Sequence, residues 1–338
     1  MFIDLGYFLL LVAVSVAVNL VIIYFSHKLD LGMDYTDSEQ HKIHKKNVPR
    51  LGGIGIYAPF IITFLFFREN KVVDQPFMLL ATFPFIIGLV EDVYRNTSAN
   101  FRFTMLAFVS FLTMFLVNEN VIVSDIGFKL PFYFAMAFTV FAFTGITNSI
   151  NIIDGLNGLS SGISLTAIFF MALLSYQNQY PNAFNSLFLL GSSILGFFII
   201  NFFTGKIFLG DSGAYFIGFV LSMSSALLAN RGSVSPWFFT VLLAYPIFDT
   251  LFSIYRRRVL KGEKSFAADA MHMHTLLYKR VFRDQFRSTV FILLVNGLFS
   301  WGAYRLREST PALIALFLLF CGFYAAGYRA IVKFKIKR

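Results

Sequence analysis

Carboxylate side chains stand at the ends of several long apolar runs in this sequence. Glu91 and Asp92 close the segment GLVED, Asp154 closes NSINIID, and Asp211 lies in the glycine-containing segment LGDSG. Adjacent carboxylates repel each other and are costly to remove from water, so they are rarely left without a cation or a function. These four residues are therefore candidates for metal binding or for acid–base chemistry.

Two asparagines precede Asp154 at intervals of three residues. On a helix, Asn148, Asn151 and Asp154 would share one face, and the glycines at 155 and 158 would allow a sharp turn. Amide and carboxylate groups at this spacing indicate a nucleotide or metal site. The structural alternative is that the asparagines cap one helix and Asp154 caps the next. Asp211 has the same two interpretations, as an N-cap or as a metal ligand beside a phosphate.

Cationic side chains precede a glycine-rich turn in the segment HKIHKKNVPRLGGIG. Its candidate phosphate-binding residues are Lys42, His44, Lys45, Lys46 and Arg50. Such cations, together with free backbone N–H groups at the glycines, suit phosphate oxygens. The alternative is a basic membrane anchor followed by glycines that serve helix packing.

The segment over 256–288 begins with three arginines and contains a His-Met-His sequence. With no cysteine nearby and a distant acid, His272 and His274 make a poor zinc site. Beside many cations they are better explained as a pair that contacts phosphate. Asp249, seven residues before Arg256, is expected to pair with the basic end of its own helix.

The elements that carry these residues must lie in a membrane. Of the 338 residues, 57% are apolar and 14% are charged, whereas a soluble domain is about 45–50% apolar and about 25% charged. A single cysteine, Cys321, excludes a disulfide framework and a cysteine-based zinc site. Because a membrane helix needs about 17–25 apolar residues, we expect an all-α bundle of about eleven transmembrane helices. The predicted spans are 5–25, 51–67, 76–90, 103–118, 131–147, 159–176, 186–203, 213–229, 236–255, 289–304 and 311–328.

The basic residues are sorted between the two sides of this predicted bundle. One side carries 22 of the 28 lysines and arginines, and the positive-inside rule makes that side cytoplasmic. The N-terminus is then outside, the C-terminus is inside, and all the candidate sites face the cytoplasm. The net charge of +10 thus reflects membrane topology, and no nucleic-acid partner is expected. We find no repeat or linker, so residues 1–338 are expected to form one integral-membrane domain, and the first span lacks the features of a cleaved signal peptide.

Carboxylates, cations and glycine turns on one face of a membrane are typical of Mg²⁺-dependent phosphoryl chemistry. Helices that deliver these groups to a membrane surface imply a substrate that lives in the membrane, such as a lipid phosphate. The alternative is a transporter of an anionic lipid or sugar phosphate. Transporters tend to place polar groups on broken helices near the bilayer midplane, whereas here the polar groups stand at helix ends.

The motifs also resemble those of a known family, the polyprenyl-phosphate N-acetylhexosamine-1-phosphate transferases (glycosyltransferase family 4). The similar segments are HKKNVPRLGGIGI, GLVED, NSINIIDGLNGL, FLGDSG, PIFDT and HMHTLLYKR. The short histidine-containing loop is more similar to the WecA-like branch, which initiates O-antigen and related cell-envelope polysaccharides, than to the peptidoglycan branch. The resemblance implies a multi-pass enzyme of the bacterial inner membrane. It would transfer a sugar-1-phosphate, by default that of GlcNAc, from a UDP-N-acetylhexosamine to undecaprenyl phosphate and release UMP.

Roles for single residues follow from the same resemblance. It implies Mg²⁺, or Mn²⁺ in its place, on Asp211 and catalytic roles for Glu91, Asp92 and Asp154. Glu91 stands where the family usually has aspartate. We therefore expect Asp92, rather than Glu91, to have the larger chemical role. The residues expected to bind substrate are Lys42, His44, Lys45, Lys46, Asn148, Asn151, Asn157, His272 and His274.

The same family pattern leaves several points open. Asn157 replaces the acid that commonly faces the uracil, which leaves that contact undecided. The lipid phosphate is expected to attack the β-phosphorus of the donor in line, with a two-step route through an aspartyl phosphate as the alternative. The sequence also leaves open the sugar, the downstream polysaccharide and the oligomeric state, a homodimer included.

Overall fold

The computed structural model of the chain describes residues 5–34, 47–66, 75–117, 121–232, 234–261 and 271–333. Within these ranges the chain is almost entirely helical, and two short strands, β1 (Met33–Asp34) and β2 (Val48–Pro49), form an antiparallel pair. Eight of the described helices are long and apolar enough to cross a membrane. The expected all-α integral membrane protein is therefore confirmed.

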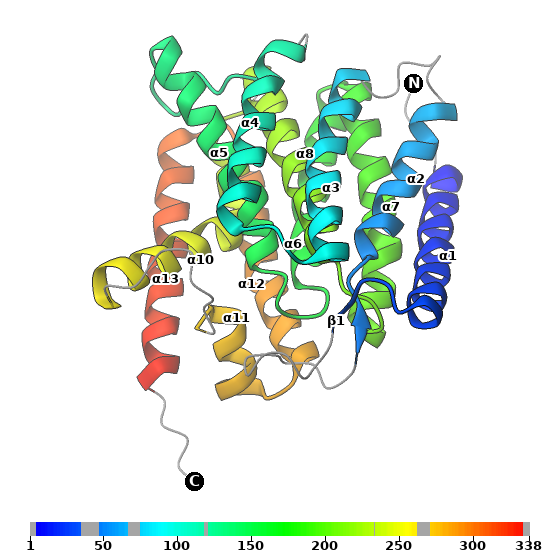
Figure 1. Ribbon diagram of the computed structural model, residues 1–338. Coiled ribbons are helices and arrows are strands. Elements are labelled where there is room, and N and C mark those ends of the chain that lie inside the picture. Colours follow the sequence, from blue (N-terminus) through cyan, green and yellow to red (C-terminus); the bar gives the residue numbers. More distant parts are fainter. Residues whose placement is uncertain are drawn as a thin grey trace.

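The long helices lie side by side in one bundle, with α1 beginning at one end and α13 finishing at the other (Figure 1). They are α1 (Leu5–Leu29), α2 (Gly52–Phe66), α3 (Gln75–Tyr94), α4 (Ala99–Leu116), α5 (Phe132–Ile152), α6 (Leu159–Gln177), α7 (Pro181–Thr204), α8 (Gly210–Asn230), α9 (Trp237–Leu242), α10 (Ala244–Tyr255), α11 (Met273–Leu276), α12 (Gln285–Arg305) and α13 (Thr310–Lys333). Two wider π-helical turns, η3 (Arg256–Lys261) and η4 (Leu277–Phe282), extend α10 and α11. Ten of the eleven predicted spans each correspond to one continuous helix.

The predicted span over 236–255 is not one helix. It is divided at Leu243 into α9 and α10, which are about 9 Å and about 18 Å long at 1.5 Å per residue. Each is shorter than the hydrocarbon core of about 30 Å. Pro246 lies in the first turn of α10, where it has no N–H to bond the carbonyl of Leu242. In Figure 1, α10 runs across the direction of the other helices.

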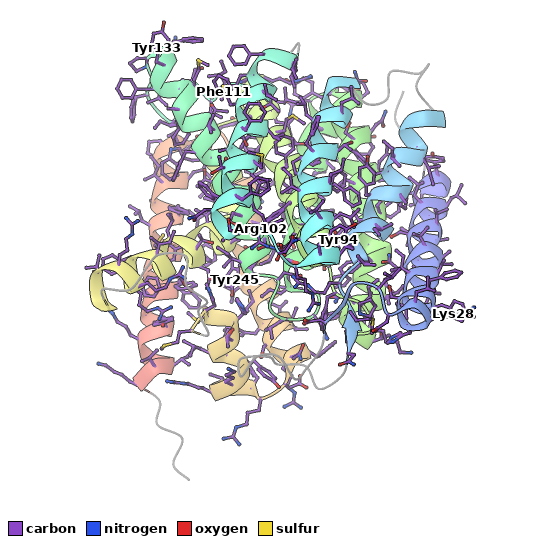
Figure 2. All side chains as sticks on the ribbon, in the orientation of Figure 1. Lys28, Tyr94, Arg102, Phe111, Tyr133 and Tyr245 are labelled. Carbon is purple, nitrogen blue, oxygen red and sulfur yellow. The ribbon has the colours of Figure 1, made fainter. Side chains whose placement is uncertain are left out.

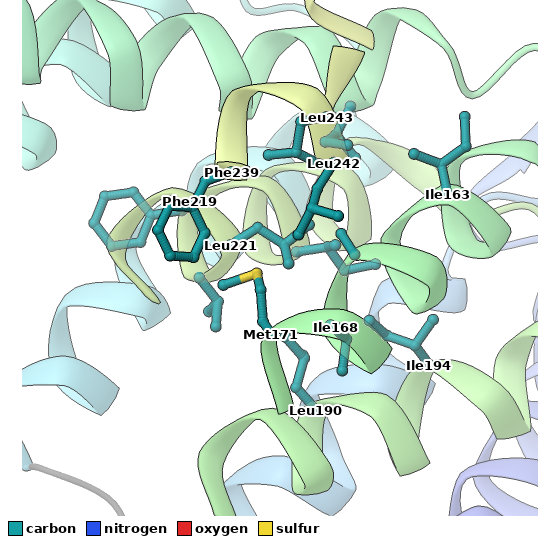
Figure 3. Close-up of a cluster of buried hydrophobic side chains, with 14 of the residues drawn as sticks. Ile163, Ile168, Met171, Leu190, Ile194, Phe219, Leu221, Phe239, Leu242 and Leu243 are labelled. Atoms are coloured by element: carbon teal, nitrogen blue, oxygen red, sulfur yellow. The ribbon is translucent and has the colours of Figure 1, made fainter. Parts of the chain in front are cut away.

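Helix α8 forms the centre of the bundle. Nearly all its residues are buried, and it packs mainly against α3 and α5. Glycine allows the close approach to α5, because a Cβ at Gly218 would lie 2.7 Å from the Cα of Thr147. Small residues are common where two membrane helices pack closely against each other. Around α8, apolar side chains of α6, α7 and α9 interlock (Figure 3), so the position of α8 is fixed from several sides.

The outer surface of the bundle is rich in apolar and aromatic side chains. Phe111 and Tyr133 are 43% and 81% exposed, and Figure 2 shows them toward the end of the bundle opposite Lys28. Exposed aromatic side chains of this kind are expected where a protein faces lipid and the membrane–water boundary. The polar groups described next lie inside the bundle instead.

Candidate active site

The start of α2 lies directly against the segment that leads into α8. The N–H groups of Gly52 and Gly53 donate to the carbonyls of Phe208 and Leu209 at 3.0 and 2.9 Å. A Cβ at Gly53 would lie 2.3 Å from the backbone nitrogen of Gly213. The glycine-rich turn therefore serves close backbone packing, one of its two expected roles, and so brings the chain before α2 beside the first turn of α8.

Asp92, at the end of α3, caps the N-terminus of α8. Its Oδ1 accepts the N–H of Asp211 at 2.8 Å, and its Oδ2 accepts the N–H and the hydroxyl of Ser212 at 2.9 and 2.6 Å. A carboxylate suits this position because the first N–H groups of a helix are unpaired and carry partial positive charge. Gly210 has φ +74°, and a Cβ there would lie 2.5 Å from Oδ2 of Asp92. Asp211 is therefore not the N-cap of α8, and that alternative is wrong.

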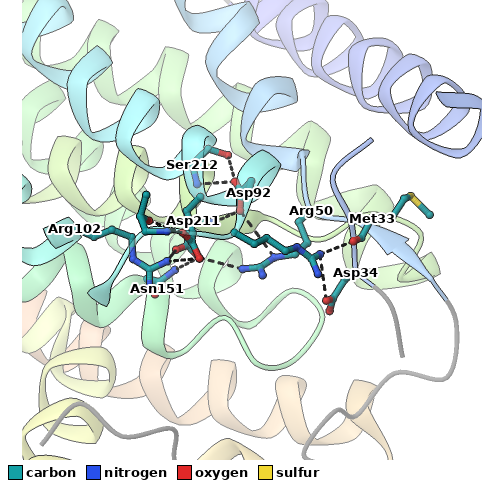
Figure 4. A network of polar contacts seen from close by, with 11 residues as sticks. Met33, Asp34, Arg50, Asp92, Arg102, Asn151, Asp211 and Ser212 are labelled. Atoms are coloured by element: carbon teal, nitrogen blue, oxygen red, sulfur yellow. Dashed lines mark hydrogen bonds and ion pairs between the residues drawn. The ribbon is translucent and has the colours of Figure 1, made fainter. Parts of the chain in front are cut away.

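The side chain of Asp211 is held by three groups from three other parts of the chain (Figure 4). Its Oδ1 accepts from Arg50 at 3.1 Å and from the amide of Asn151, on the last turn of α5, at 2.9 Å. Its Oδ2 accepts from Arg102, on α4, at 3.0 Å. The carboxylate is 7% exposed, and two guanidinium groups balance its charge in this partly dehydrated position.

Glu91 is adjacent to Asp92 in the chain but has different partners. Its Oε1 forms an ion pair with Arg102 at 2.8 Å, and its Oε2 accepts from the backbone N–H of Thr97 at 3.1 Å and from the Thr97 hydroxyl. Successive helical residues point about 100° apart, which separates the two carboxylates. Arg102 thus bridges Glu91 and Asp211, while Asp92 lies behind them against the helix start.

Asp154 follows the end of α5 and accepts the Ser160 hydroxyl at 2.6 Å. Burial raises the pKa of its carboxyl to about 7, against the lowering effects of the Ser160 hydrogen bond and of Arg50. Asn148 lies one turn before Asn151 on α5 and is half-buried. Of the three residues expected to share one helix face, Asn151 contacts Asp211, and Asp154 lies beyond the last helical turn.

The segment after Asp154 is tied to α7 and α12. Asn201, on α7, accepts the N–H of Gly158 at 2.6 Å and donates to the carbonyl of Ile207 at 2.7 Å. The carbonyl of Asn157 accepts the Thr289 hydroxyl at 3.0 Å. Asn157 is therefore placed by its backbone between α7 and α12, and its expected contact with a base stays a prediction.

His272, directly before α11, and His274, in its first turn, lie beside the segment of Asp154. The Nδ1 of His272 lies 2.6 Å from Oδ2 of Asp249, and the two histidine rings stack with centroids 5.4 Å apart. The Nε2 of His274 would be 2.6 Å from a Cβ placed on Gly155, so this ring packs on the residue after Asp154. The expected pairing of Asp249 with Arg256 is wrong, because the carboxylate binds His272 instead.

The sequence interpretation named Arg50 among the cations that could bind phosphate, but it did not predict the contact of Arg50 with Asp211, and it missed Arg102. Arg50 is the last cation before the glycine-rich turn, and Arg102 is the second cation after GLVED on the same predicted side of the membrane. Their position next to the expected acidic residues was the available signal. Lys42, His44, Lys45 and Lys46 lie outside the described residues, so their expected role stays a prediction.

Asp211 could supply one carboxylate ligand to a magnesium ion, in exchange for hydrogen bonds that it accepts from Arg50, Arg102 and Asn151. Within the described ranges, no three His, Cys, Asp or Glu side chains converge as a metal cage. Mg²⁺ is commonly held by one or two carboxylates, with water and substrate phosphates completing its shell. Asp211 offers a carboxylate of this type, beside two arginines that suit phosphate oxygens.

Comparisons with known proteins show the family of the chain. Residues 75–229 match the model of glycosyl transferase family 4. The chain is 30% identical over 269 residues to the undecaprenyl-phosphate alpha-N-acetylglucosaminyl 1-phosphate transferase of Thermotoga maritima, and the match covers 79% of this chain and 80% of that protein. The chain belongs to glycosyl transferase family 4. The resemblance seen in the motifs is thereby confirmed.

Two further relatives match a larger share of the chain. One is a probable undecaprenyl-phosphate N-acetylglucosaminyl 1-phosphate transferase of Bacillus subtilis, 29% identical over 299 residues, which are 82% of this chain and 78% of that protein. The other, from Escherichia coli O157:H7, is an undecaprenyl-phosphate alpha-N-acetylglucosaminyl 1-phosphate transferase, 24% identical over 330 residues, with 94% and 89% covered. The match to the family 4 model spans α3 to α8 and so includes Asp92, Asn151 and Asp211.

Proposed function

We propose that this family 4 protein transfers a sugar-1-phosphate from a UDP-N-acetylhexosamine to undecaprenyl phosphate and releases UMP. The observation that carries the proposal is the Asp211 carboxylate, held by Arg50, Arg102 and Asn151 at the start of α8. Relatives named as N-acetylglucosaminyl 1-phosphate transferases make UDP-GlcNAc the default donor. The lipid product would initiate a cell-envelope polysaccharide of the O-antigen type.

The reaction needs positioning and charge balance more than a strong base. A phosphate monoester has a second pKa of about 6, so the lipid phosphate is largely ionised at neutral pH. Its oxygen attacks the β-phosphorus of the donor, and the bond from that phosphorus to the oxygen of UMP breaks. Arg50 and Arg102 are placed to hold phosphate oxygens, as expected for a reaction catalysed by orientation and electrostatics.

Magnesium is part of the proposal. When bound, Mg²⁺ would neutralise charge on the phosphate oxygens, with Asp211 as its protein ligand. Asp92 keeps Asp211 in place through the first turn of α8. Glu91 keeps Arg102 in place, and Asp154 lies on the adjoining turn, where its protonation state alters the local charge.

We also propose a bacterial inner-membrane location, with about eleven spans and the site at the cytoplasmic face. The support is the sorting of 22 of the 28 basic residues to one side. A reporter protein fused after residue 338 should be active in the cytoplasm. If the fusion were active only in the periplasm, both the sidedness and the cytoplasmic site would be wrong.

The function is tested by adding single UDP-sugars to membranes that contain the protein and radiolabelled undecaprenyl phosphate. UDP-GlcNAc, UDP-GalNAc and UDP-glucose form a suitable panel. We expect a labelled lipid diphosphate sugar and UMP in equal amounts with one N-acetylhexosamine donor, and at least about 100-fold slower formation of both products by the Asp211→Asn variant. If no donor gives product while labelled lipid moves between the leaflets, the protein is a transporter and the transferase proposal fails.

A further inference from the structure

The turn over 154–158, which joins α5 to α6, is held by side chains of other helices. The carbonyl of Asn157 accepts the Thr289 hydroxyl at 3.0 Å, and the N–H of Asn157 points to Oε1 of Gln285 at the longer distance of 3.5 Å. Both partners come from the start of α12. Main-chain groups outside helices and sheets need such partners when they are withdrawn from water. The conformation of this turn therefore depends on α12.

Thr289 uses its hydroxyl differently from the serine next to it. Both side chains are buried. The Ser288 hydroxyl donates to the carbonyl of Asp284 at 2.7 Å, four residues earlier in the chain, which is a common bond for such a residue in a helix. The Thr289 hydroxyl instead binds a carbonyl that lies 132 residues earlier. Thr289 therefore connects α12 to the 154–158 turn.

Aromatic packing joins the same helix to the same turn. Gly158 has φ +75°, and a Cβ there would lie 2.4 Å from a ring carbon of Phe202, on α7. The Phe202 ring stacks on that of Phe286, on α12, with centroids 4.9 Å apart. Asn201, beside Phe202, accepts the N–H of Gly158 at 2.6 Å. The turn is thus fixed by hydrogen bonds at Asn157 and by stacked rings at Gly158.

The side chain of Asn157 is the polar group that this arrangement orients. It is half-buried, and a Cβ placed on Gly205 would lie 2.7 Å from its amide nitrogen, so it packs over the end of α7. A primary amide presents hydrogen-bond donors and an acceptor side by side. Uracil and an N-acetyl group carry matching donors and acceptors, whereas undecaprenyl phosphate carries only hydrocarbon and phosphate. A change in the orientation of Asn157 should therefore alter the binding of the UDP-sugar.

We propose that Thr289 and Gln285 are positioning residues for the transfer reaction, which hold the main chain of Asn157 so that its amide meets the UDP-sugar. Both act through Asn157. Helix α12 lies outside residues 75–229, which match the family 4 model, so a helix beyond that match contributes to binding of the UDP-sugar. The inference rests on the proposed function.

A double-mutant cycle on the full-length protein in detergent tests the proposal. Thr289→Val removes the hydroxyl and keeps the shape of the side chain. It should raise the KM for the UDP-sugar by about 10-fold, the size expected for the loss of one positioning hydrogen bond, and Gln285→Leu should raise it less. The KM for undecaprenyl phosphate should stay unchanged in both variants. In the Asn157→Ala background neither change should raise the KM for the UDP-sugar further, because both act through the missing amide.

Two variants in the same part of α12 are the controls. Ser288→Ala removes a buried hydroxyl that bonds within its own helix, so wild-type KM values are expected. Thr289→Ser keeps a hydroxyl and should restore most of the affinity that Thr289→Val loses. A merely structural role of Thr289 would change kcat and both KM values together.

Three results would overturn the inference. One is a wild-type KM for the UDP-sugar in a Thr289→Val protein that elutes and melts as the wild type does. Another is an equal rise of the KM values for the two substrates. The third is an additive loss in the Asn157→Ala background. If Thr289→Val fails to fold, the Gln285→Leu cycle decides the question alone.

A measurement without substrate separates this inference from the proposed function. Hydrogen exchange, followed by mass spectrometry on peptides that cover 154–158, should be faster in Thr289→Val and Gln285→Leu than in the wild type, because the turn opens more readily. Ser288→Ala should exchange as the wild type does. Unchanged exchange in both Thr289→Val and Gln285→Leu would refute the positioning role even if the transferase is active. If no transfer occurs with any UDP-sugar, the proposed function fails, whatever the rate of exchange.

Discussion

The Oδ1 atom of Asp92 accepts the backbone N–H of Asp211 at 2.8 Å, so one aspartate positions another that lies 119 residues later in the chain. The same carboxylate binds the N–H and the hydroxyl of Ser212. Both oxygens of Asp92 are therefore engaged with the first turn of α8. A change in the charge or length of Asp92 must move the helix start that carries Asp211.

Asp92→Asn should impair both folding stability and turnover. An amide offers one acceptor and one donor, so its NH₂ group would face an N–H of Asp211 or Ser212 and leave that donor unpaired. An unpaired buried donor costs about 1–3 kcal/mol of unfolding free energy, and a displacement of about 1 Å can reduce turnover by about 10²-fold. Thermal unfolding in detergent and kcat are the measurements. Asp125→Asn, in an exposed turn whose aspartate caps Gly127, is the control, and equal kcat in the two variants would contradict the role of Asp92.

Asp211→Asn should make turnover insensitive to Mg²⁺ and reduce it by at least about 100-fold, equivalent to about 2.7 kcal/mol. An amide is neutral, so it binds Mg²⁺ weakly and no longer balances the charges of Arg50 and Arg102. Activity is measured over a series of Mg²⁺ concentrations with EDTA-treated membranes. Near-normal turnover at limiting Mg²⁺ would remove Asp211 from the metal site.

Gly88→Ala should disrupt the contact between α3 and α8. A Cβ at Gly88 would lie 2.3 Å from the nitrogen of Ser212 and 2.4 Å from the carbonyl carbon of Asp211, both backbone atoms that cannot rotate away. Overpacking costs about 1–3 kcal/mol, and here it would also displace the Asp211 carboxylate. The midpoint of thermal unfolding and kcat should both fall. Gly297→Ala, on α12, brings its Cβ within 4 Å of no atom outside its own stretch of helix, so it should leave kcat unchanged and should not lower the midpoint. Equal behaviour of the two variants would refute the argument.

The sequence predicts the helices and the grouping of the acidic motifs because both follow from simple regularities. Apolar runs must match the bilayer, and the sidedness of basic residues brings the loops of Asp92, Asn151 and Asp211 to one face. The contact between Asn151 and Asp211 agrees with that grouping. Asp92 caps α8 because of the way in which α3 packs against α8. No local sequence pattern predicts this packing.

Partners on distant elements could not be predicted from the sequence. Asp249 was expected to pair with Arg256, the nearest cation at the end of its own helix. Its partners are instead His272 and Tyr324, which lie 23 and 75 residues away in the sequence. The same region contains the break between α9 and α10. Pro246 has no backbone N–H to donate within the helix. An averaged hydropathy contains no information on hydrogen bonds, so residues 236–255 resembled an ordinary membrane span.

The stability of the protein should fall as pH rises, because of Asp154. Burial raises the pKa of this carboxyl from 3.8 to about 7 in the folded protein. The folded state therefore holds a proton that the unfolded state has released, and stability decreases with rising pH wherever the folded state binds more protons. The contribution is fully present below the unfolded value of 3.8 and is lost as pH rises through about 7. Asp154→Asn removes the titrating group but keeps an oxygen that can accept the Ser160 hydroxyl.

The difference in pH dependence between the wild type and Asp154→Asn separates the effect of Asp154 from that of the other titrating groups. Thermal midpoints in detergent, without Mg²⁺, are compared at about pH 5 and about pH 8, on either side of the raised pKa. The wild type should lose several degrees more than Asp154→Asn over this interval, because a carboxyl with a folded-state pKa of about 7 contributes about 3 kcal/mol of stability at pH 5 that is lost by pH 8. Ser160→Ala removes the hydroxyl that favours the ionised carboxylate, so its midpoint should fall more steeply with pH than that of the wild type. If the wild type and Asp154→Asn have parallel pH dependences, the Asp154 carboxyl is ionised throughout this range and its surroundings are wetter than its burial indicates.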